Sequence, residues 1–280
     1  YNPNIGPIHE IGLDGILAKN DRNNPFNDWN FAALPYASGD LHMGDKDFPY
    51  TATDGSKCIC HHHGLRNLDA LLKLAVETFP HTKTLLITGS SAGAFGAVAN
   101  APRIARAFPQ IQRTVIFADG AQGRYPGWKQ VLRDVWNADP LYVDALDDEG
   151  RLIKVLFEQA WKALGDQAVY LHSNTTHDGV LCGLENAMNR GRMDTSPEAL
   201  DFFNAALRED TAALAAELPR YRYYVTNYRR NPKTGVTGHT FIGGRLFTRA
   251  AMEEGRTLAR WLDDAVNRDI LVNAGERHIV

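Results

Sequence analysis

The segment from residue 82 to residue 107 constrains the fold of this chain more than any other. An apolar run, TKTLLITG, leads into the turn GSSAG (89–93) and then into a stretch with the pattern of a helix. Gly-x-Ser-x-Gly between a strand and a helix is a nucleophile elbow, a strained turn that needs small flanking residues and exposes its central serine. The pattern predicts Ser91 as a nucleophile and the Ala92 N–H, at the helix N-terminus, as a donor to an oxyanion.

The same kind of glycine-rich turn can instead cradle a phosphate group. That use requires either the Lys-Ser/Thr ending of a P-loop or a Gly-x-Gly-x-x-Gly spacing followed by an acidic residue, and neither is present here. The nucleophile interpretation is therefore favoured.

Short β-branched runs alternate with amphipathic segments along the rest of the chain, which is typical of the α/β class. We expect an α/β-hydrolase fold, with a mostly parallel central sheet flanked by helices on both faces. No repeat or low-complexity linker divides residues 1–280, so one domain is expected. The expected strands are 30–36, 58–64, 82–89, 113–120, 166–174 and 221–227, and the expected helices are 66–79, 90–108 (either continuous or broken at Pro102), 152–164, 197–218 and 248–268.

Charge and composition exclude several classes of partner. A formal charge of −3 gives no overall attraction to nucleic acid or to an anionic membrane. No run approaches the roughly 20 apolar residues of a membrane span, so stable membrane insertion is not expected. The chain starts without Met and without a secretory pattern, and we expect that it has been processed or truncated. Three cysteines are too few for a disulfide framework and allow one bridge at most, or free buried thiols. The sequence leaves the oligomeric state open.

Chain order selects the general base. In an α/β-hydrolase the catalytic residues follow the order serine, acid, histidine, each at the carboxyl end of a strand. Two histidines follow the last expected strand, and His278 lies too close to the terminus to be held accurately. His239, in the glycine-containing loop NPKTGVTGHTF, is therefore the expected base.

Two aspartates compete for the role of the acid that orients this histidine. Asp178 follows the strand 166–174, which is the commoner position for the acid. Asp119 ends the preceding strand and is the alternative acid; its other expected role is to bind backbone amides around Gly120 and Gly123. Asp178 is favoured, and both remain candidates.

Three consecutive histidines, His61, His62 and His63, follow Cys58 and Cys60 and suggest a zinc site. Along a strand the first and third histidine point to one face and the second to the other, so the three cannot converge on one ion. We expect no metal, and assign these histidines to packing and hydrogen bonding.

Five motifs occur in order along the chain and are recognisable together. They are PYASGDLHMGD (35–45), HHHGLRN (61–67), TGSSAGAFGA (88–97), ADGAQG (118–123) and GHT (238–240). The chain resembles the pectin acetylesterase and Notum family, especially its bacterial branch, from about Asn24 to Thr248. The ordered set is far more specific than the serine turn alone.

The resemblance implies a carboxylic ester hydrolase that removes acyl groups through a Ser-His-Asp triad and an acyl-enzyme, with no cofactor. By position, Ser91 matches the family nucleophile, Asp178 the acid and His239 the base. The expected substrate is an acetylated polysaccharide such as pectin, or a small-molecule ester. The alternative substrates are a polyester, a lipid or an acylated protein. The alternative function is that of a catalytically weak relative that binds a glycan or a lipid. Expected substrate-binding residues are Tyr36, Gly39, Asp40, His42 and Gln122, with Trp128 in the cleft wall or the core.

Family members usually have a glycine-rich segment upstream of the NPFNDW-like stretch, and its amides complete the oxyanion hole. This chain starts after that segment, so we expect the N-terminal strands and one of two oxyanion donors to be missing, at a cost of about 10²–10³ in turnover. The resemblance also implies secretion or a periplasmic location.

Overall fold

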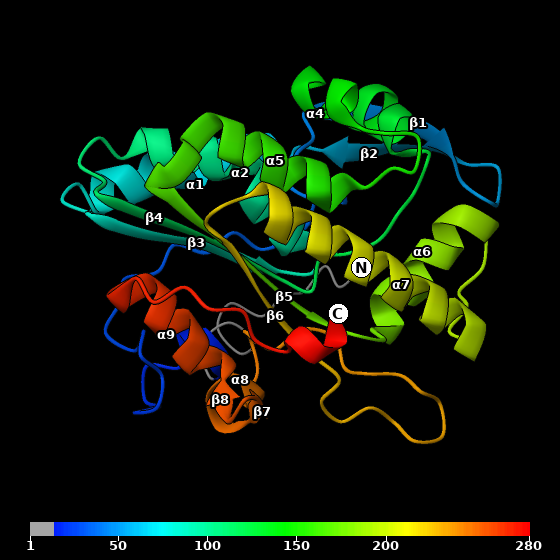
Figure 1. The fold of residues 1–280 in the computed structure, drawn as a ribbon. Helices are drawn as coiled ribbons and strands as arrows, with labels where there is room; N and C mark the ends of the chain where they lie inside the picture. Colours follow the sequence, from blue (N-terminus) through cyan, green and yellow to red (C-terminus); the bar gives the residue numbers. More distant parts are fainter. Residues whose placement is uncertain (1–13) are drawn as a thin grey trace.

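The computed structural model describes residues 14–280, which form a parallel four-stranded sheet between two layers of helices (Figure 1). The strand order is β3-β4-β5-β6. Helices α1, α2, α5 and α7 lie on one side of the sheet and α9 on the other, as expected for an α/β-hydrolase. The sheet strands are β3 (Thr84–Ser90), β4 (Arg113–Asp119), β5 (Ala168–Thr175) and β6 (Tyr221–Thr226).

The helices are α1 (Gly64–Thr78), α2 (Ala92–Ala107), α3 (Trp128–Gln130), α4 (Pro140–Ala145), α5 (Leu152–Leu164), α6 (Gly179–Arg190), α7 (Pro197–Glu217), α8 (Leu246–Arg249) and α9 (Leu258–Arg268). Two small antiparallel pairs lie outside the main sheet: β1 (Lys46–Thr51) with β2 (Lys57–His62), and β7 (Ala251–Glu253) with β8 (Arg256–Thr257). Shorter helical turns are η1 (Gly15–Leu17), η2 (Val131–Trp136), η3 (Gly165–Gln167) and η4 (Glu276–His278).

The alternation of side chains along the strands builds one core on each face of the sheet. Ile116 and Tyr170 are fully buried in the cluster that contains the apolar faces of α2 and α5. Phe117 and Leu171, each one residue further along, are fully buried in the opposite cluster with Trp261 of α9. This period of two fixes the strand register, because a slip by one residue would exchange the two faces.

The register aligns the carboxyl ends of the strands and so gathers the loops that follow them. Ser90 pairs with Asp119, and Asp119 pairs with Ser173 on the next strand. The Ser91 N–H donates to the Asp119 carbonyl over 2.9 Å, which extends this alignment into the serine turn. In a parallel sheet this edge is where ligands bind.

Two expected strands are corrected by the structure. Residues 30–36 form no strand; Pro35 has no N–H to give to a ladder, and the apolar side chains of this stretch line a cavity instead. The segment 58–64 does contain a strand, β2, but it pairs antiparallel with β1, a strand that sequence reasoning missed. It is not part of the parallel sheet.

The last expected helix, 248–268, is also too long. The chain reverses at Glu254 and Gly255, which both have positive φ, and the β7–β8 pair forms there. The helix begins only at Leu258, where the Thr257 side chain caps it by accepting from the Arg260 N–H. The helix α6 was not expected.

Cys58, Cys60 and Cys182 are all free thiols, so the single bridge that their number allowed does not form. Among residues 14–280, no helix combines the length and apolarity that crossing a bilayer requires.

Candidate active site

Ser91 lies at a sharp turn between β3 and α2. Its backbone has φ 55° and ψ −122°, a conformation that non-glycine residues rarely adopt. A Cβ atom at Gly89 would lie 2.1 Å from the Gly93 carbonyl oxygen, so the turn closes only with glycine at this position. The local sequence therefore produces the strained elbow that the Gly-x-Ser-x-Gly pattern predicts.

The Ala92 N–H is the first amide of α2. The first amides of a helix have no intrahelical acceptor, and the helix dipole places partial positive charge at this end. The amide next to the serine is thus suited to binding a developing oxyanion, as the sequence predicts.

Asp178 and His239 are brought together by the two loops that follow β5 and β6. The His239 Nδ1 atom lies 2.6 Å from Asp178 Oδ2. The other oxygen, Oδ1, accepts the Val180 and Leu181 N–H groups and caps α6. Because only 1% of Asp178 is exposed, water does not screen this pair strongly. The carboxylate is held so that it fixes the orientation of the imidazole.

Neighbouring loops hold the His239 backbone in place. The Thr237 N–H donates to the His177 carbonyl over 2.9 Å, and the Thr175 hydroxyl donates to the Gly238 carbonyl over 2.7 Å. These contacts tie the histidine loop to the end of β5, the strand that precedes Asp178. Sequence reasoning did not find the two threonines.

Asp119 contacts the chain beyond His239 rather than the imidazole itself. One carboxylate oxygen accepts the Phe241 and Ile242 N–H groups over 2.7 and 2.8 Å. The other accepts the Ser173 hydroxyl over 2.6 Å. Burial raises the pKa of this carboxyl, although the hydrogen bonds oppose the shift. Asp119 binds amides, as the sequence suggested, but amides of residues 241–242 and not those near Gly120 and Gly123; it anchors the histidine loop.

The second imidazole nitrogen, His239 Nε2, is buried and has no hydrogen-bond partner among the described residues. The ring lies against Gly120. This glycine directly follows Asp119, the residue of β4 that pairs with Ser90 at the end of β3. In residues 14–280 no hydrogen bond joins this nitrogen to the Ser91 hydroxyl. Catalytic hydrogen bonds are often long before substrate binds.

A largely apolar cavity of about 880 Å³ includes Ser91 and Ala92 in its lining. It continues along the outer side of β3, which is an edge strand within the described residues, toward Leu72 of α1. The stretch from residue 28 to residue 36 forms another wall. The cavity is larger than an acetyl group requires.

Two of the five expected substrate-binding residues, Tyr36 and His42, line this cavity. Their rings lie 4.9 Å apart, and the Leu41 N–H donates to the Tyr36 hydroxyl. Burial raises the pKa of Tyr36 to about 12 and lowers that of His42, so both rings are neutral near neutral pH. His42 packs on Gly96 of α2, where a Cβ would lie 2.8 Å from its ring.

The other three expected contacts do not line the cavity. Asp40 is fully buried and accepts the Ser38 hydroxyl and the amides of His42, Gly44 and Gly64, so it organises the loop. Gln122 is buried and donates to Asp210 over 2.8 Å. Gly39 has positive φ and faces His62, and Trp128 is a core residue. Asp40 has a structural role because its carboxylate oxygens accept hydrogen bonds from the protein, and the Gln122 amide nitrogen is held by Asp210 while its Oε1 has no partner among residues 14–280.

Residues 8–125 match the sequence model of the Pectinacetylesterase family. The chain is similar to the pectin acetylesterase and Notum family. A palmitoleoyl-protein carboxylesterase NOTUM of Schmidtea mediterranea is 31% identical over 129 residues, which cover 43% of this chain and 23% of that protein. The chain thus spans about a quarter of the length of this Notum relative.

The fold of a Notum structure agrees with the similarity in sequence. The Wnt deacylase Notum from Drosophila superimposes with a TM-score of 0.61 over 92% of this chain and 75% of that one, at 18% identity. At this identity the likeness concerns the fold. The matched family region includes Ser91 and ends before Asp178 and His239, whose assignment depends on the geometry described above.

Proposed function

We propose that this protein is a carboxylic ester hydrolase in which Ser91 is the nucleophile. The observation that carries the proposal is His239: its Nδ1 is held by Asp178, and its Nε2 is buried without a partner beside the strand end that bears the serine. This orientation supports a role for His239 as the general base, because the base of a serine hydrolase is held at one ring nitrogen by a carboxylate and uses the other for proton transfer.

The proposed reaction has two displacements. His239 takes the Ser91 proton as the hydroxyl oxygen attacks the ester carbonyl, and the Ala92 N–H stabilises the oxyanion. The alcohol leaves with that proton, which gives an acyl-enzyme. A water molecule, deprotonated by the same imidazole, then attacks the acyl carbon, and the proton returns to the serine as the acid is released. Asp178 stabilises the imidazolium in both steps.

The family similarity supports the first candidate for the substrate class. The matched family description names pectin acetylesterase activity, which supports an acetylated polysaccharide as substrate. The protein would act without a cofactor, and as a secreted or periplasmic protein, as the resemblance implies; both are predictions.

The apolar cavity favours a second substrate class, an ester with a longer acyl chain. The cavity that includes Ser91 is largely apolar and larger than an acetyl group requires, and the Notum relative is named for a palmitoleoyl ester. Burial of each additional CH₂ contributes about 0.8 kcal/mol to binding. A higher kcat/KM for p-nitrophenyl octanoate than for the acetate would support this class, and the reverse order would favour acetyl esters.

The test of the hydrolase itself is the rate of p-nitrophenyl acetate hydrolysis by the parent chain and by Ser91→Ala and His239→Ala. Ser90→Ala is a matched control, because Ser90 is a neighbouring serine of the same turn. We expect both site variants to lose activity and the control to retain it, with circular dichroism showing that all are folded. Equal rates in all four proteins would refute the mechanism and leave a glycan- or lipid-binding protein.

A further inference from the structure

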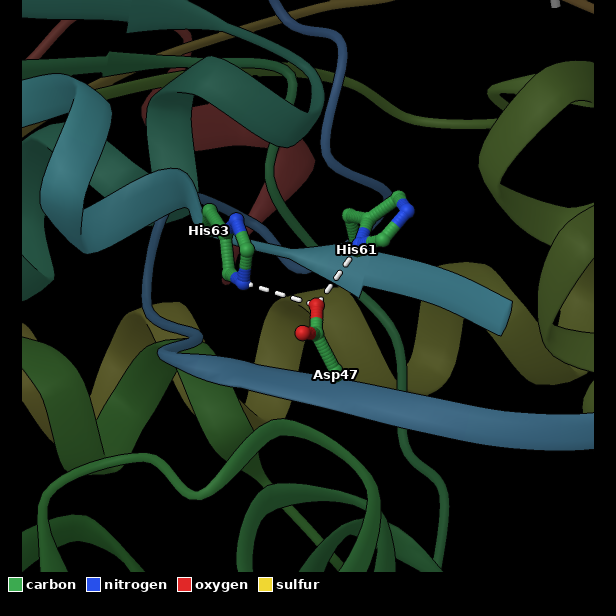
Figure 2. Close-up of side chains that lie close together, drawn as sticks. All are labelled: Asp47, His61 and His63. Carbon is green, nitrogen blue, oxygen red and sulfur yellow. Dashed lines mark hydrogen bonds and ion pairs between the residues drawn. The ribbon is translucent and has the colours of Figure 1, made fainter.

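A cluster of two histidines and one aspartate lies on the outer face of the β1–β2 hairpin (Figure 2). Asp47 is on β1 and pairs with His61 on β2, and His63 follows at the N-cap of α1. The ligand atoms of the three residues all lie within 4.8 Å of one another. This cluster has no role in the proposed hydrolysis.

Alternation along β2 separates this cluster from the neighbouring histidine. His61 and His63 point to the Asp47 side, while the buried His62 contacts the Ser38 carbonyl on the other side over 2.9 Å. Three consecutive histidines do not converge on an ion, as the sequence predicts. The structure adds a carboxylate from a different strand, which sequence reasoning did not consider.

The contacts within the cluster leave one nitrogen without a satisfactory partner. His61 Nδ1 lies 2.6 Å and His63 Nε2 lies 2.9 Å from the same oxygen, Asp47 Oδ1. Only the His61 contact has hydrogen-bond geometry, and His63 Nε2 is a buried atom with no hydrogen-bond partner among residues 14–280. Two imidazole nitrogens and a carboxylate oxygen thus face one small volume.

We propose that Asp47, His61 and His63 bind a divalent transition-metal ion such as Zn²⁺. Two imidazoles and a carboxylate are a ligand set that zinc accepts, with water completing the tetrahedron. Ligand bonds of about 2.0–2.1 Å would place the three atoms roughly 3.4 Å apart. To reach this arrangement, the two short contacts to Asp47 Oδ1 would lengthen by less than about 1 Å, and the two nitrogens would move closer together. Side-chain rotations can produce these shifts because the surface is partly exposed.

The charges around the cluster are compatible with a cation. The nearest fixed positive charge, Arg66, is paired with Asp45. Lys46, although adjacent in sequence, points to the Asp134 carbonyl on the other side of β1. The ion would join β1, β2 and the start of α1.

The experiment is a calorimetric titration of the metal-stripped, tag-free protein with ZnCl₂. We expect one equivalent to bind, and His61→Asn and His63→Asn each to weaken binding at least about tenfold, because even the loss of a supporting contact costs metal sites that much. His81→Asn, at an exposed histidine outside the cluster, is the matched control and should bind like the parent.

Cys60 and His62 form the rival pair, since their Sγ and Nδ1 atoms lie 3.9 Å apart on the opposite face. Cys60→Ser should retain the bound equivalent. No zinc binding by the folded parent, or full binding by the folded His61→Asn and His63→Asn variants, would overturn the proposal. Loss of binding in Cys60→Ser alone would also overturn it, by assigning the ion to the other face.

Discussion

The imidazole of His239 lies so close to Gly120 that a methyl group on that glycine would be 3.2 Å from the ring Cε1. Gly120 also has φ 71° and would place the methyl 2.7 Å from Thr240 Cγ2. The residue after β4 therefore sets how closely the base can approach the strand end. Gly120, the first glycine of the ADGAQG motif, is therefore required by the geometry of the site.

Gly120→Ala should displace the His239 ring by a few tenths of an ångström and lower kcat for p-nitrophenyl acetate, by less than the roughly 100-fold effect of a 1 Å misplacement. Positive φ should cost about 1–2 kcal/mol of stability in addition. Gly238→Ala is the matched control, because a Cβ there meets nothing within 4 Å. Equal kcat values for the two folded variants would contradict this role of Gly120.

Asp178→Asn should lower kcat by about 10⁴, the effect of removing the orienting carboxylate in a serine triad. Asparagine is as good an N-cap as aspartate, so α6 should keep its cap and the protein its stability. Steady-state kinetics and thermal unfolding measure the two effects separately. Near-parental kcat in this variant would exclude Asp178 as the acid.

Substitutions of Asp119 should affect stability more than the Asp178 substitution does, as measured by the same steady-state kinetics and thermal unfolding. Asp119→Asn keeps an oxygen that can accept the Phe241 and Ile242 amides, so it should retain most activity. Asp119→Ala leaves those buried N–H groups unpaired, at about 1–3 kcal/mol each, and should lower both the melting temperature and kcat. If Asp119→Asn were inactive but stable, Asp119 and not Asp178 would be the acid.

His172 gives a stability prediction that depends on pH. Burial lowers its pKa from 6.5 to about 4. Between these values the unfolded chain takes up a proton that the folded protein does not, so stability should fall as pH decreases from about 6.5 to about 4. This pKa shift corresponds to a decrease of about 3 kcal/mol in the free energy of unfolding over that pH range. Urea unfolding at several pH values should show a flatter profile for His172→Gln than for the parent; an unchanged profile would contradict the assignment.

The local sequence predicted the strained turn at Ser91, because the flanking Gly89 is needed to close it. Chain order and strand ends favoured Asp178 with His239 and kept Asp119 as an alternative acid, and the catalytic roles of these residues stay predictions. The four strands of the main sheet were also identified, and the apolar runs of β4 and β5 are buried on both faces.

Contacts between distant segments were not predictable in the same way. Gln122 looked available for substrate in a polar motif, but Asp210 of α7 occupies its amide. Asp47 became a neighbour of His61 only through a hairpin that the sequence pattern did not reveal. Residues 30–36 have strand-like composition, but Pro35 interrupts the ladder N–H groups and the apolar side chains line a cavity.

The hydrogen bonds between Asp119 and the residues after His239 have a consequence for synthesis on the ribosome. The nucleophile turn and its sheet neighbours emerge well before the loop that supplies the base, and Asp119 can fix that loop only when residues 241 and 242 have left the exit tunnel. A nascent chain that ends within β6 therefore carries the serine without its base. The proposed catalytic site can therefore form only late in translation, when nearly the whole described chain is already available to fold.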